Sequence, residues 1–476
     1  MELPEGFVAV VKQDCPTCVL VDPILKEMES RGTPVTVYVQ DDPAFPTVSR
    51  VIDDRALEHS FHLNIETVPT LIKVEAGHEA TRIVGWERAE WEAFTGLSKL
   101  GEGLPGYRPG CGSKSVEPGI AERLAISFGD VQFGARAVEL PSLQDDIEYC
   151  FEHGWSDGLP VVPPTEERVY RMLQGTRRAA DEVLGLVPPN HSECTITKVA
   201  INAVMAGCKP EYLPVVIACV EAALDPAFCL HGLLATTWFS GPMAIVNGPI
   251  RASIGMNWRG NLLGQGNRAN ATIGRALQLL VRNVGGGRPQ GADQSAFGTP
   301  VKYGSCFAED DATAWTTLAE DRGIAAGASS ATLFSADGPI GCADQKSREP
   351  KGLITSLAGT LVAIDHHRMA NAADVVIVVG PEHGRVFDSA GWSKADAVDA
   401  LQSATRIHGH DLGMGTDKSA AAAAHADGDG TLAKFREGGI HLVRAGGDAG
   451  MFSAIIPGWL VKGELGTDPV TREITP

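Results

Sequence analysis

The sequence predicts an α/β protein with more than one domain. The apolar run Phe7–Val11 leads directly into a Cys-x-x-Cys pair and a helix start. Far along the chain, the fully apolar run Asp374–Val379 is typical of a strand inside a parallel sheet. A helix capped by Ser393 and a second strand at Gly439–Val443 follow it, which predicts a βαβ unit. The length of 476 residues is enough for about three domains.

Residues 1–97 form a self-contained pattern of short elements. A helix is expected after Cys15, and Asp53–His62 is expected to be helical as well. The other expected elements are strands at Phe7–Val11, Val35–Val39, Leu71–Glu75 and Arg82–Val84 and a closing helix at Glu87–Phe94. The predicted order is therefore β-α-β-α-β-β-α.

Cys15 and Cys18 are the first candidate catalytic residues. A helix N-terminus carries partial positive charge and free N–H groups, which favour a thiolate. We therefore expect Cys15 to have a lowered pKa and to be the attacking thiol. Pro16 suits the first helical turn, and Cys18 lies one turn further on, where it can close a disulfide. A zinc site would need a second cysteine pair, and none is nearby.

This segment resembles a thioredoxin-fold domain. Cys15-Pro16-Thr17-Cys18 matches the redox pair, and Val68-Pro69-Thr70 stands where that family carries its cis-proline before a strand. The resemblance implies that Pro69 lies against the dithiol. No Trp precedes Cys15, and the pair between the cysteines is Pro-Thr rather than Gly-Pro, which leaves the reduction potential open.

Residues 98–140 are predicted to be an irregular, exposed linker because glycine and proline are frequent there. Cys111 lies in it between two glycines, near Arg108 and Lys114, in the kind of setting that suits a reactive thiol. We consider it a mobile shuttle thiol or a substrate-facing nucleophile served by Cys15 and Cys18. The alternative is an incidental cysteine in a glycine-rich turn.

Residues 141–476 are predicted to form a larger α/β catalytic domain, with two subdomains as an alternative. A strand is expected at Met243–Val246, before the turn Asn247-Gly248-Pro249. Helices are expected at Thr195–Ala206, Tyr212–Leu224 and Asn270–Asn283.

Two glycine-rich turns follow the C-terminal strands and carry polar groups. Ligands of open α/β sheets bind beyond the carboxyl ends of strands, so Glu382, His383 and Asp448 are candidates for acid–base catalysis. A second glycine-rich segment opens the helix near residue 270, where free N–H groups and arginines suit a carboxylate or phosphate. The candidate substrate-binding residues are Asn267, Arg268, Asn270, Arg275 and Asn247.

Cys208 and Cys306 are further candidate thiols, although buried structural cysteines are commoner than catalytic ones. A metal would have to use His366 and His367, or His408 and His410, and neither pair has an HExxH-type spacing. We therefore expect no metal and no cofactor beyond the redox dithiol.

The large domain resembles an uncharacterised bacterial family that is often fused to thioredoxin-like modules. The resemblance rests on four segments, 154–164, 203–208, 266–272 and 380–383. In addition, Gly110-Cys111-Gly112-Ser113 is similar to the motif that labels a group of cysteine or selenocysteine proteins. These resemblances imply an enzyme with a redox-active thiol step, and they transfer no substrate or catalytic residue.

The net charge of −19 argues against nucleic acid or an anionic membrane as a partner. The start of the chain lacks signal-peptide features, no run reaches the ~18 apolar residues of a membrane span, and the ten cysteines do not form a disulfide framework. We expect a cytoplasmic protein whose partners are a small-molecule substrate and a thiol reductant or reductase protein. A homo-oligomer remains open.

The leading hypothesis is a thiol-dependent oxidoreductase that acts on a small, anionic or sulfur-containing metabolite. Cys15 and Cys18 would supply or remove electrons, and the fusion would make delivery intramolecular. The first alternative is a carbon–sulfur lyase or transferase whose thiol the Cys-x-x-Cys module resets. The second is a redox sensor or chaperone without turnover.

Overall fold

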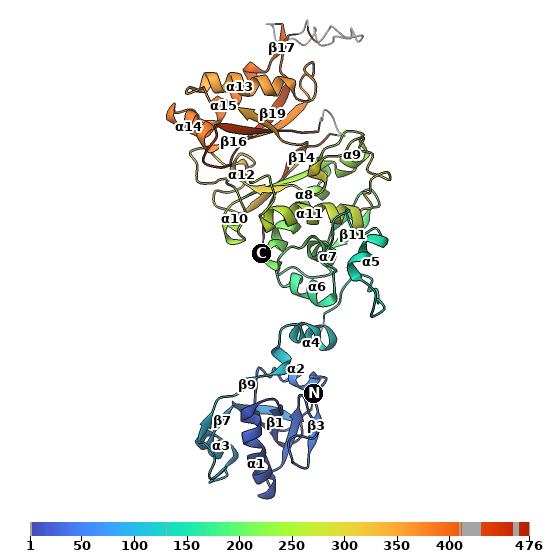
Figure 1. The fold of residues 1–476 in the computed structure, drawn as a ribbon, viewed down its shortest axis with the longest axis vertical. Coiled ribbons are helices and arrows are strands. Elements are labelled where there is room, and N and C mark those ends of the chain that lie inside the picture. The colour runs from blue at the N-terminus through green and yellow to red at the C-terminus, as the bar shows by residue number, and fades with distance from the viewer. Residues whose placement is uncertain (1, 130, 409–410, 412–429, 460–465, 476) are drawn as a thin grey trace. The chain divides into compact units, whose positions relative to one another are not determined.

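The chain forms two compact units, Met1–Gln132 and Phe133–Pro476. The computed structural model describes residues 2–129, 131–408, 411, 430–459 and 466–475 (Figure 1). Both units combine helices with parallel and antiparallel strands, so the predicted α/β class is confirmed. The boundary falls inside the segment that the sequence predicts to be a linker.

The first unit is built on a five-stranded sheet with the order β3-β2-β1-β5-β6. β1, β2 and β3 are parallel, and β5 and β6 are antiparallel to their neighbours. The strands are β1 (Gly6–Val11), β2 (Val35–Val39), β3 (Val51–Asp53), β5 (Thr70–Glu75) and β6 (His78–Val84), and the helices are α1 (Pro16–Ser30), α2 (Glu58–His62) and α3 (Arg88–Thr95). The expected elements are present, and β3 is an additional strand.

The central strand explains the position of Cys15. Phe7 to Val11 are all buried, as expected for a middle strand that is covered on both faces. The chain leaves this strand and begins α1 with Cys15 as the N-cap residue and Pro16 in the first turn. The peptide bond before Pro69 is cis, which is the form that the resemblance implies at this position.

The predicted linker differs from the structure between residues 107 and 128, which belong to the first unit. Two short strands, β8 (Tyr107–Arg108) and β9 (Cys111–Gly112), pair with β7 (Trp86–Glu87) and β4 (Thr67–Val68). The short turn η1 (Lys114–Val116) and the helix α4 (Ile120–Phe128) follow. Phe128 at the end of α4 packs on the aromatic rings of α2. The content of glycine and proline suggested an irregular chain. Strands of two residues are too short to show a periodic pattern in the sequence, so their pairing could not be predicted.

The second unit stacks two four-stranded sheets between two layers of helices (Figure 1). The first sheet has the order β13-β12-β14-β21, and the second has the order β15-β20-β16-β19. The strands are β12 (Gly241–Asn247), β13 (Cys306–Ala308), β14 (Ser330–Ala336), β21 (Val470–Glu473), β15 (Ile340–Ala343), β16 (Ala373–Val379), β19 (Phe435–Arg444) and β20 (Phe452–Pro457).

The alternation of side chains along each strand separates the layers of this core. Ile245 of β12 and Val376 of β16 meet between the sheets, whereas Val246 and Ile377 face the helices on the outer sides. The helices are α7 (Ile196–Ala206), α8 (Leu213–Leu224) and α11 (Arg268–Asn283) on the first sheet and α13 (Pro350–Ala363), α14 (Pro381–Ser389) and α15 (Lys394–Ala404) on the second.

The sequence located β12, β16 and β19 and the helices α7, α8, α11 and α15, but not the other strands of the two sheets. β16 and β19 are parallel neighbours, as the expected βαβ unit requires. Ser393 and Asp396 form the capping box of α15. The remaining elements are α5 (Asp146–Glu152), α6 (Glu166–Leu173), β10 (Val183–Val187), β11 (Ser192–Thr195), α9 (Leu230–Ala235), α10 (Ile250–Ser253), α12 (Leu318–Asp321), β17 (Ile407–His408), β18 (Thr431–Leu432) and the 3₁₀ turns η2 (Pro210–Tyr212), η3 (Pro226–Phe228) and η4 (Pro300–Lys302).

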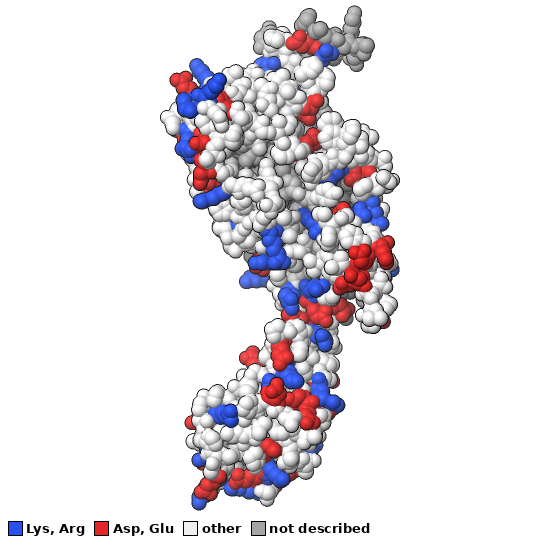
Figure 2. All heavy atoms as spheres, in the orientation of Figure 1, with Lys and Arg blue, Asp and Glu red and all other residues white. Residues whose placement is uncertain are grey.

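Acidic side chains outnumber basic ones and gather in places on the surface. Figure 2 shows one such group over α5, whose first turn carries Asp146 and Glu148 after the N-cap Asp145. Among the described residues, no single helix is long and apolar enough to cross a membrane. One pair bent by 72°, Pro210–Leu224 with Pro226–Ala235, reaches that length and composition only together.

Candidate functional site

Cys15 lies at the end of β1, where the chain turns into α1. Its sulfur accepts the backbone N–H of Cys18 at 3.4 Å and lies 3.7 Å from the carbonyl oxygen of Val68. The side chain is only 1% exposed, and Cys18 is fully buried. The dithiol and the residue before Pro69 therefore form one site, as the sequence predicted.

The two thiols of this pair differ in acidity. A hydrogen bond from the Cys18 thiol, supported by the thiol of Cys111 and by backbone N–H groups, lowers the pKa of Cys15 to about 5 against the opposing effect of burial. Burial, and then the interaction with Cys15, raises the pKa of Cys18 far above its ordinary value. Near neutral pH Cys15 is therefore a thiolate and Cys18 a thiol.

Cys111 completes the group of sulfurs. Its sulfur lies 2.7 Å from that of Cys15, although the two residues are 96 positions apart in the chain. All three cysteines are reduced, and no disulfide joins them. The basic neighbours predicted an acidic Cys111, but burial and the Cys15 sulfur raise its pKa instead. Its role is thus that of a proton-bearing neighbour of the Cys15 thiolate.

We call Tyr107–Gly112 the strap, because it lies across the dithiol and pairs at both ends. β8 pairs with β7, and β9 pairs with β4, which is the strand that leads into Pro69. Between them, the carbonyl oxygen of Pro109 accepts the Thr17 hydroxyl at 2.6 Å. A side chain on Gly110 would meet Thr67 at 2.4 Å and the Val68 carbonyl oxygen at 2.9 Å, so only glycine fits there.

A buried polar network anchors the chain just after the strap. The Gln40 amide donates to the hydroxyls of Ser113 at 2.6 Å and Ser60 at 2.8 Å. Ser115 donates to the Ile65 carbonyl oxygen at 2.6 Å. Buried, satisfied networks of this kind fix one arrangement of the backbone. Sequence reasoning missed this network, since its members come from four separate segments.

The predicted acid–base group of the second unit is used for structure. His383 is fully buried, with its Nδ1 2.8 Å from the Ser453 hydroxyl and its Nε2 3.1 Å from the Asp344 carbonyl oxygen. The Glu382 carboxylate accepts the backbone N–H groups of Gly450 and Met451, which lowers its pKa. These bonds join the two glycine-rich turns to each other. Asp448 is exposed in one of them.

The residues predicted to bind an anion are also held by other parts of the protein. Arg275 forms a two-point ion pair with Asp157, at 2.8 Å on both sides. Arg268 donates to the carbonyl oxygen of Gly207 at the end of α7. Asn267 caps α11, and the Asn270 side chain bonds the backbone of Asn257 on both sides. These side chains therefore make structural contacts at this helix start, and the anion site stays a prediction.

Asn247, the last of the predicted substrate-binding residues, keeps one side-chain atom without a partner among the described residues. It is 1% exposed at the carboxyl end of β12, and its amide N–H donates to Glu309 at 2.7 Å and Asp311 at 3.1 Å. Its amide oxygen is buried and has no hydrogen-bond partner among the described residues. Burial raises the pKa of Glu309 to about 7. This titratable carboxyl group was not singled out from the sequence.

Cys208 and Cys306 are buried in the helical core of the second unit. Burial raises the pKa of Cys208 to about 12 and that of Cys306 well above its ordinary value. Both are therefore thiols at neutral pH, and only a thiolate is a strong nucleophile. Their environment suits packing rather than the catalysis that the sequence suggested.

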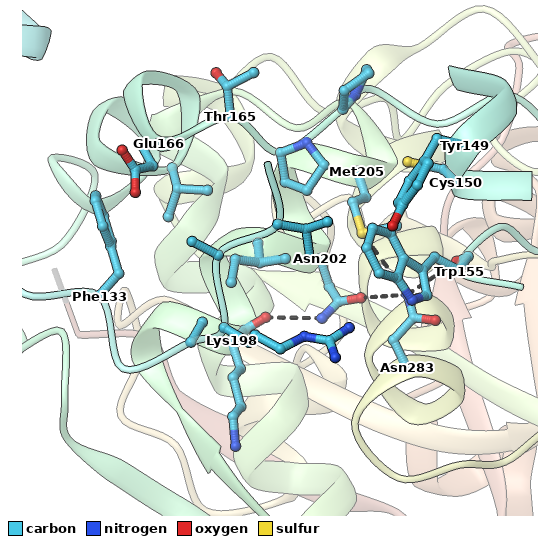
Figure 3. Close-up of a pocket in the computed structure, with 18 of the residues that line it drawn as sticks. Phe133, Tyr149, Cys150, Trp155, Thr165, Glu166, Lys198, Asn202, Met205 and Asn283 are labelled. Atoms are coloured by element: carbon cyan, nitrogen blue, oxygen red, sulfur yellow. Dashed lines mark hydrogen bonds between the residues drawn. The ribbon is translucent and has the colours of Figure 1, made fainter. Parts of the chain in front are cut away.

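A cavity of ≈ 790 Å³ lies in the second unit (Figure 3). The rings of Phe133, Tyr149 and Trp155 and the chains of Lys198 and Arg288 contribute to its wall. Figure 3 shows Asn202 and Asn283 bonded to each other at its base, at 3.0 Å. Trp155 and Met205 of this wall belong to the segments 154–164 and 203–208, which carry the family resemblance and are the sequence signals that pointed here.

Within the described ranges, no group of three or more His, Cys, Asp or Glu side chains is arranged to hold a metal ion. The pair His408 and His410 is not tested, since His410 lies outside the described residues. Comparisons with protein-family models, with curated proteins and with solved structures find no match to this chain.

Proposed function

We propose that the first unit is a thioredoxin-like module for thiol–disulfide exchange, with Cys15 as the nucleophile. The observation that carries the proposal is the Cys15 sulfur, which has a pKa of about 5 and two thiols, Cys18 and Cys111, within reach. The strand order β3-β2-β1-β5-β6 and the start of α1 at Cys15 support it.

The exchange proceeds in two displacements. The Cys15 thiolate attacks a disulfide R–S–S–R′, so that a Cys15–S–S–R bond forms and R′–S⁻ leaves. Cys18 or Cys111 then loses its proton and attacks the Cys15 sulfur, which releases R–S⁻ and leaves a protein disulfide. Two electrons pass from two protein thiols to the substrate disulfide, and the reverse sequence oxidises a dithiol substrate.

Cys111 offers a route between the buried Cys15 and the surface of the module. Cys15 is 1% exposed beneath the strap, whereas Cys111 is partly exposed. A disulfide formed between Cys15 and Cys111 would connect the buried Cys15 with a sulfur that lies nearer the surface. This geometry favours a small thiol or disulfide as substrate, since a folded protein could reach Cys15 only after the strap moves.

We place the substrate of the whole enzyme, a small anionic or sulfur-containing metabolite, in the cavity of Figure 3. Its volume of ≈ 790 Å³ lies in the range of small-molecule sites, and rings and cations contribute to its wall. The raised pKa values of Cys208 and Cys306 argue against these two buried thiols as the nucleophile of the lyase alternative.

The test is a trap in the full-length chain. Cys18→Ser protein is treated with glutathione disulfide, alkylated, digested and mapped by mass spectrometry. We expect a Cys15–Cys111 disulfide within one chain, and in the Cys18→Ser/Cys111→Ser protein a stable Cys15–glutathione adduct.

Cys194→Ser is the matched control, because Cys194 is fully buried and belongs to the core of the second unit. It should leave the pattern of the wild-type protein unchanged. Modification of other cysteines while Cys15 stays reduced would refute the proposal.

A further inference from the structure

Another cavity lies where β12 and β13 end, and we call it the strand-end pocket. Its volume is ≈ 330 Å³, and Asn247, Gly248, Arg251, Ala252 and Asp311 line part of it. β12 and β13 are parallel, so their carboxyl ends open on the same edge of the sheet. Such edges are the usual ligand sites of α/β folds.

Two carboxylates fix the orientation of the Asn247 amide. Its nitrogen donates to Glu309 Oε2 at 2.7 Å and to Asp311 Oδ1 at 3.1 Å. A flipped amide would place its oxygen against two acceptor oxygens, so this orientation follows from the hydrogen bonds. The amide oxygen therefore points away from both carboxylates, and it is buried without a partner in the described part of the chain.

Arg251 supplies an unused donor beside it. Its Nε donates to Asp311 Oδ2 at 2.8 Å, and its guanidinium lies over the Trp258 ring at 4.1 Å. These contacts hold the side chain in one position. Its Nη1 is buried and has no hydrogen-bond partner in the described ranges.

A third unused group lies on the neighbouring strand. Ser330 is opposite Asn247 in the register of β14 and is fully buried, and its hydroxyl also has no partner among the described residues. The described residues contain eight buried side-chain nitrogen or oxygen atoms without a hydrogen-bond partner. Three of them belong to Asn247, Arg251 and Ser330, at the same end of β12. Native proteins leave few such groups unsatisfied, so a concentration of them marks a place where a polar ligand would find hydrogen-bonding partners.

We propose that the strand-end pocket binds a small zwitterionic amino acid. The unused Arg251 N–H groups would donate to the carboxylate, and the Asn247 amide oxygen would accept from the ammonium group. Arg251 and Asp311 already neutralise each other, so a carboxylate alone would add an uncompensated negative charge, whereas a zwitterion adds none. Glu309 is a positioning residue, since it acts through Asn247.

This site is independent of the thiol chemistry proposed for the first unit. Its test therefore uses binding alone, measured by calorimetry and thermal unfolding of the full-length protein in the reduced state. The probes are L-alanine, L-lactate and propionate, which share a carboxylate and differ in the group on the neighbouring carbon. We expect alanine to bind and to raise the Tm, lactate to bind more weakly, and propionate not to bind.

Two variants are matched by a control. Arg251→Gln should weaken alanine binding about ten-fold or more, because a charge-assisted hydrogen bond is lost. Arg259→Gln is the control, since Arg259 lies 5.9 Å from the same Trp258 ring but outside the pocket lining. Ala252→Leu tests the space itself: Ala252 is exposed on α10, so a larger side chain fills the pocket without disturbing the core.

The proposal fails if alanine does not bind the wild-type protein, if lactate binds as tightly as alanine, or if folded Arg251→Gln and Ala252→Leu proteins bind alanine like the wild type. None of these outcomes bears on the Cys15 trap, so the two proposals can fail separately.

Discussion

At the scale of single residues, the three sulfurs of one site differ in acidity. Cys15 accepts hydrogen bonds, and its pKa is lowered to about 5, whereas burial raises the pKa values of Cys18 and Cys111. The start of α1 was expected to stabilise the Cys15 thiolate through the helix N-terminus. The main contribution comes from the Cys18 thiol, and Cys111 and the backbone N–H groups of Cys18 and Thr17 at this helix start add to it.

The lowered pKa of Cys15 predicts how the reactivity of its sulfur depends on pH. A lowered pKa means that the thiolate persists above about pH 5 and is lost as the pH falls through that value. The rate of Cys15 alkylation by iodoacetamide, followed by mass spectrometry, should therefore show a midpoint near pH 5. Cys111→Ala should move the midpoint upward, because one hydrogen-bond donor to the thiolate is removed.

Cys150 provides an internal comparison in the same samples, since burial raises its pKa above the ordinary thiol value. Its alkylation should rise only at much higher pH. A Cys15 midpoint near the unperturbed value of about 8.5 would contradict the assignment of Cys15 as the nucleophile.

At the scale of elements, we infer that the strap limits access to the dithiol. It is held by two short antiparallel pairs and by the bond from Thr17 to Pro109. Gly110 permits its close approach to Thr67 and Val68. An element held by so few backbone bonds opens at low free-energy cost compared with the sheet beneath it.

Gly110→Ala should loosen the strap and uncover Cys15. The added Cβ would lie 2.4 Å from Thr67, and overpacking of this kind costs about 1–3 kcal/mol. We expect alkylation of Cys15 at neutral pH to become about ten-fold faster, with the Tm of the first unit lowered slightly.

Gly112→Ala is the matched control, because a Cβ at Gly112 would meet no atom within 4 Å. This variant should react like the wild type. Equal rates for the two variants would show that the strap does not limit access to Cys15.

At the scale of the whole molecule, each unit carries its own hydrophobic core. One core cluster draws only on residues up to Cys111, and the other three draw only on residues from Phe133 onward. Cores that share no residues predict separate cooperative folding.

Fragments 1–132 and 133–476 should therefore fold independently. We expect the far-UV circular dichroism of the two fragments to add up to that of the full chain, and each fragment to show its own cooperative melting transition. An unfolded 1–132 fragment would mean that the first unit needs the second for stability.

The α/β class, the helix that begins at Cys15 and the strand Asp374–Val379 could be predicted, because they depend on local pattern: apolar alternation, proline at a helix start and capping residues. The candidate site was predictable only in part. The lowered pKa of Cys15 was foreseen, but the internal uses of His383 and Arg275 were not, since their partners lie far away in the chain.

The sequence by itself determined that a dithiol opens the first helix and which residues flank it in the chain, because both follow from neighbours along the chain. Only the tertiary structure decided that Cys111 lies against Cys15, across 96 positions, and that Asn247 and Arg251 keep unused hydrogen-bonding atoms at one sheet edge. These outcomes depend on which distant backbone segments pair and which polar groups they leave unmatched. Neither the pairing nor the unmatched polar groups can be predicted from the local sequence pattern.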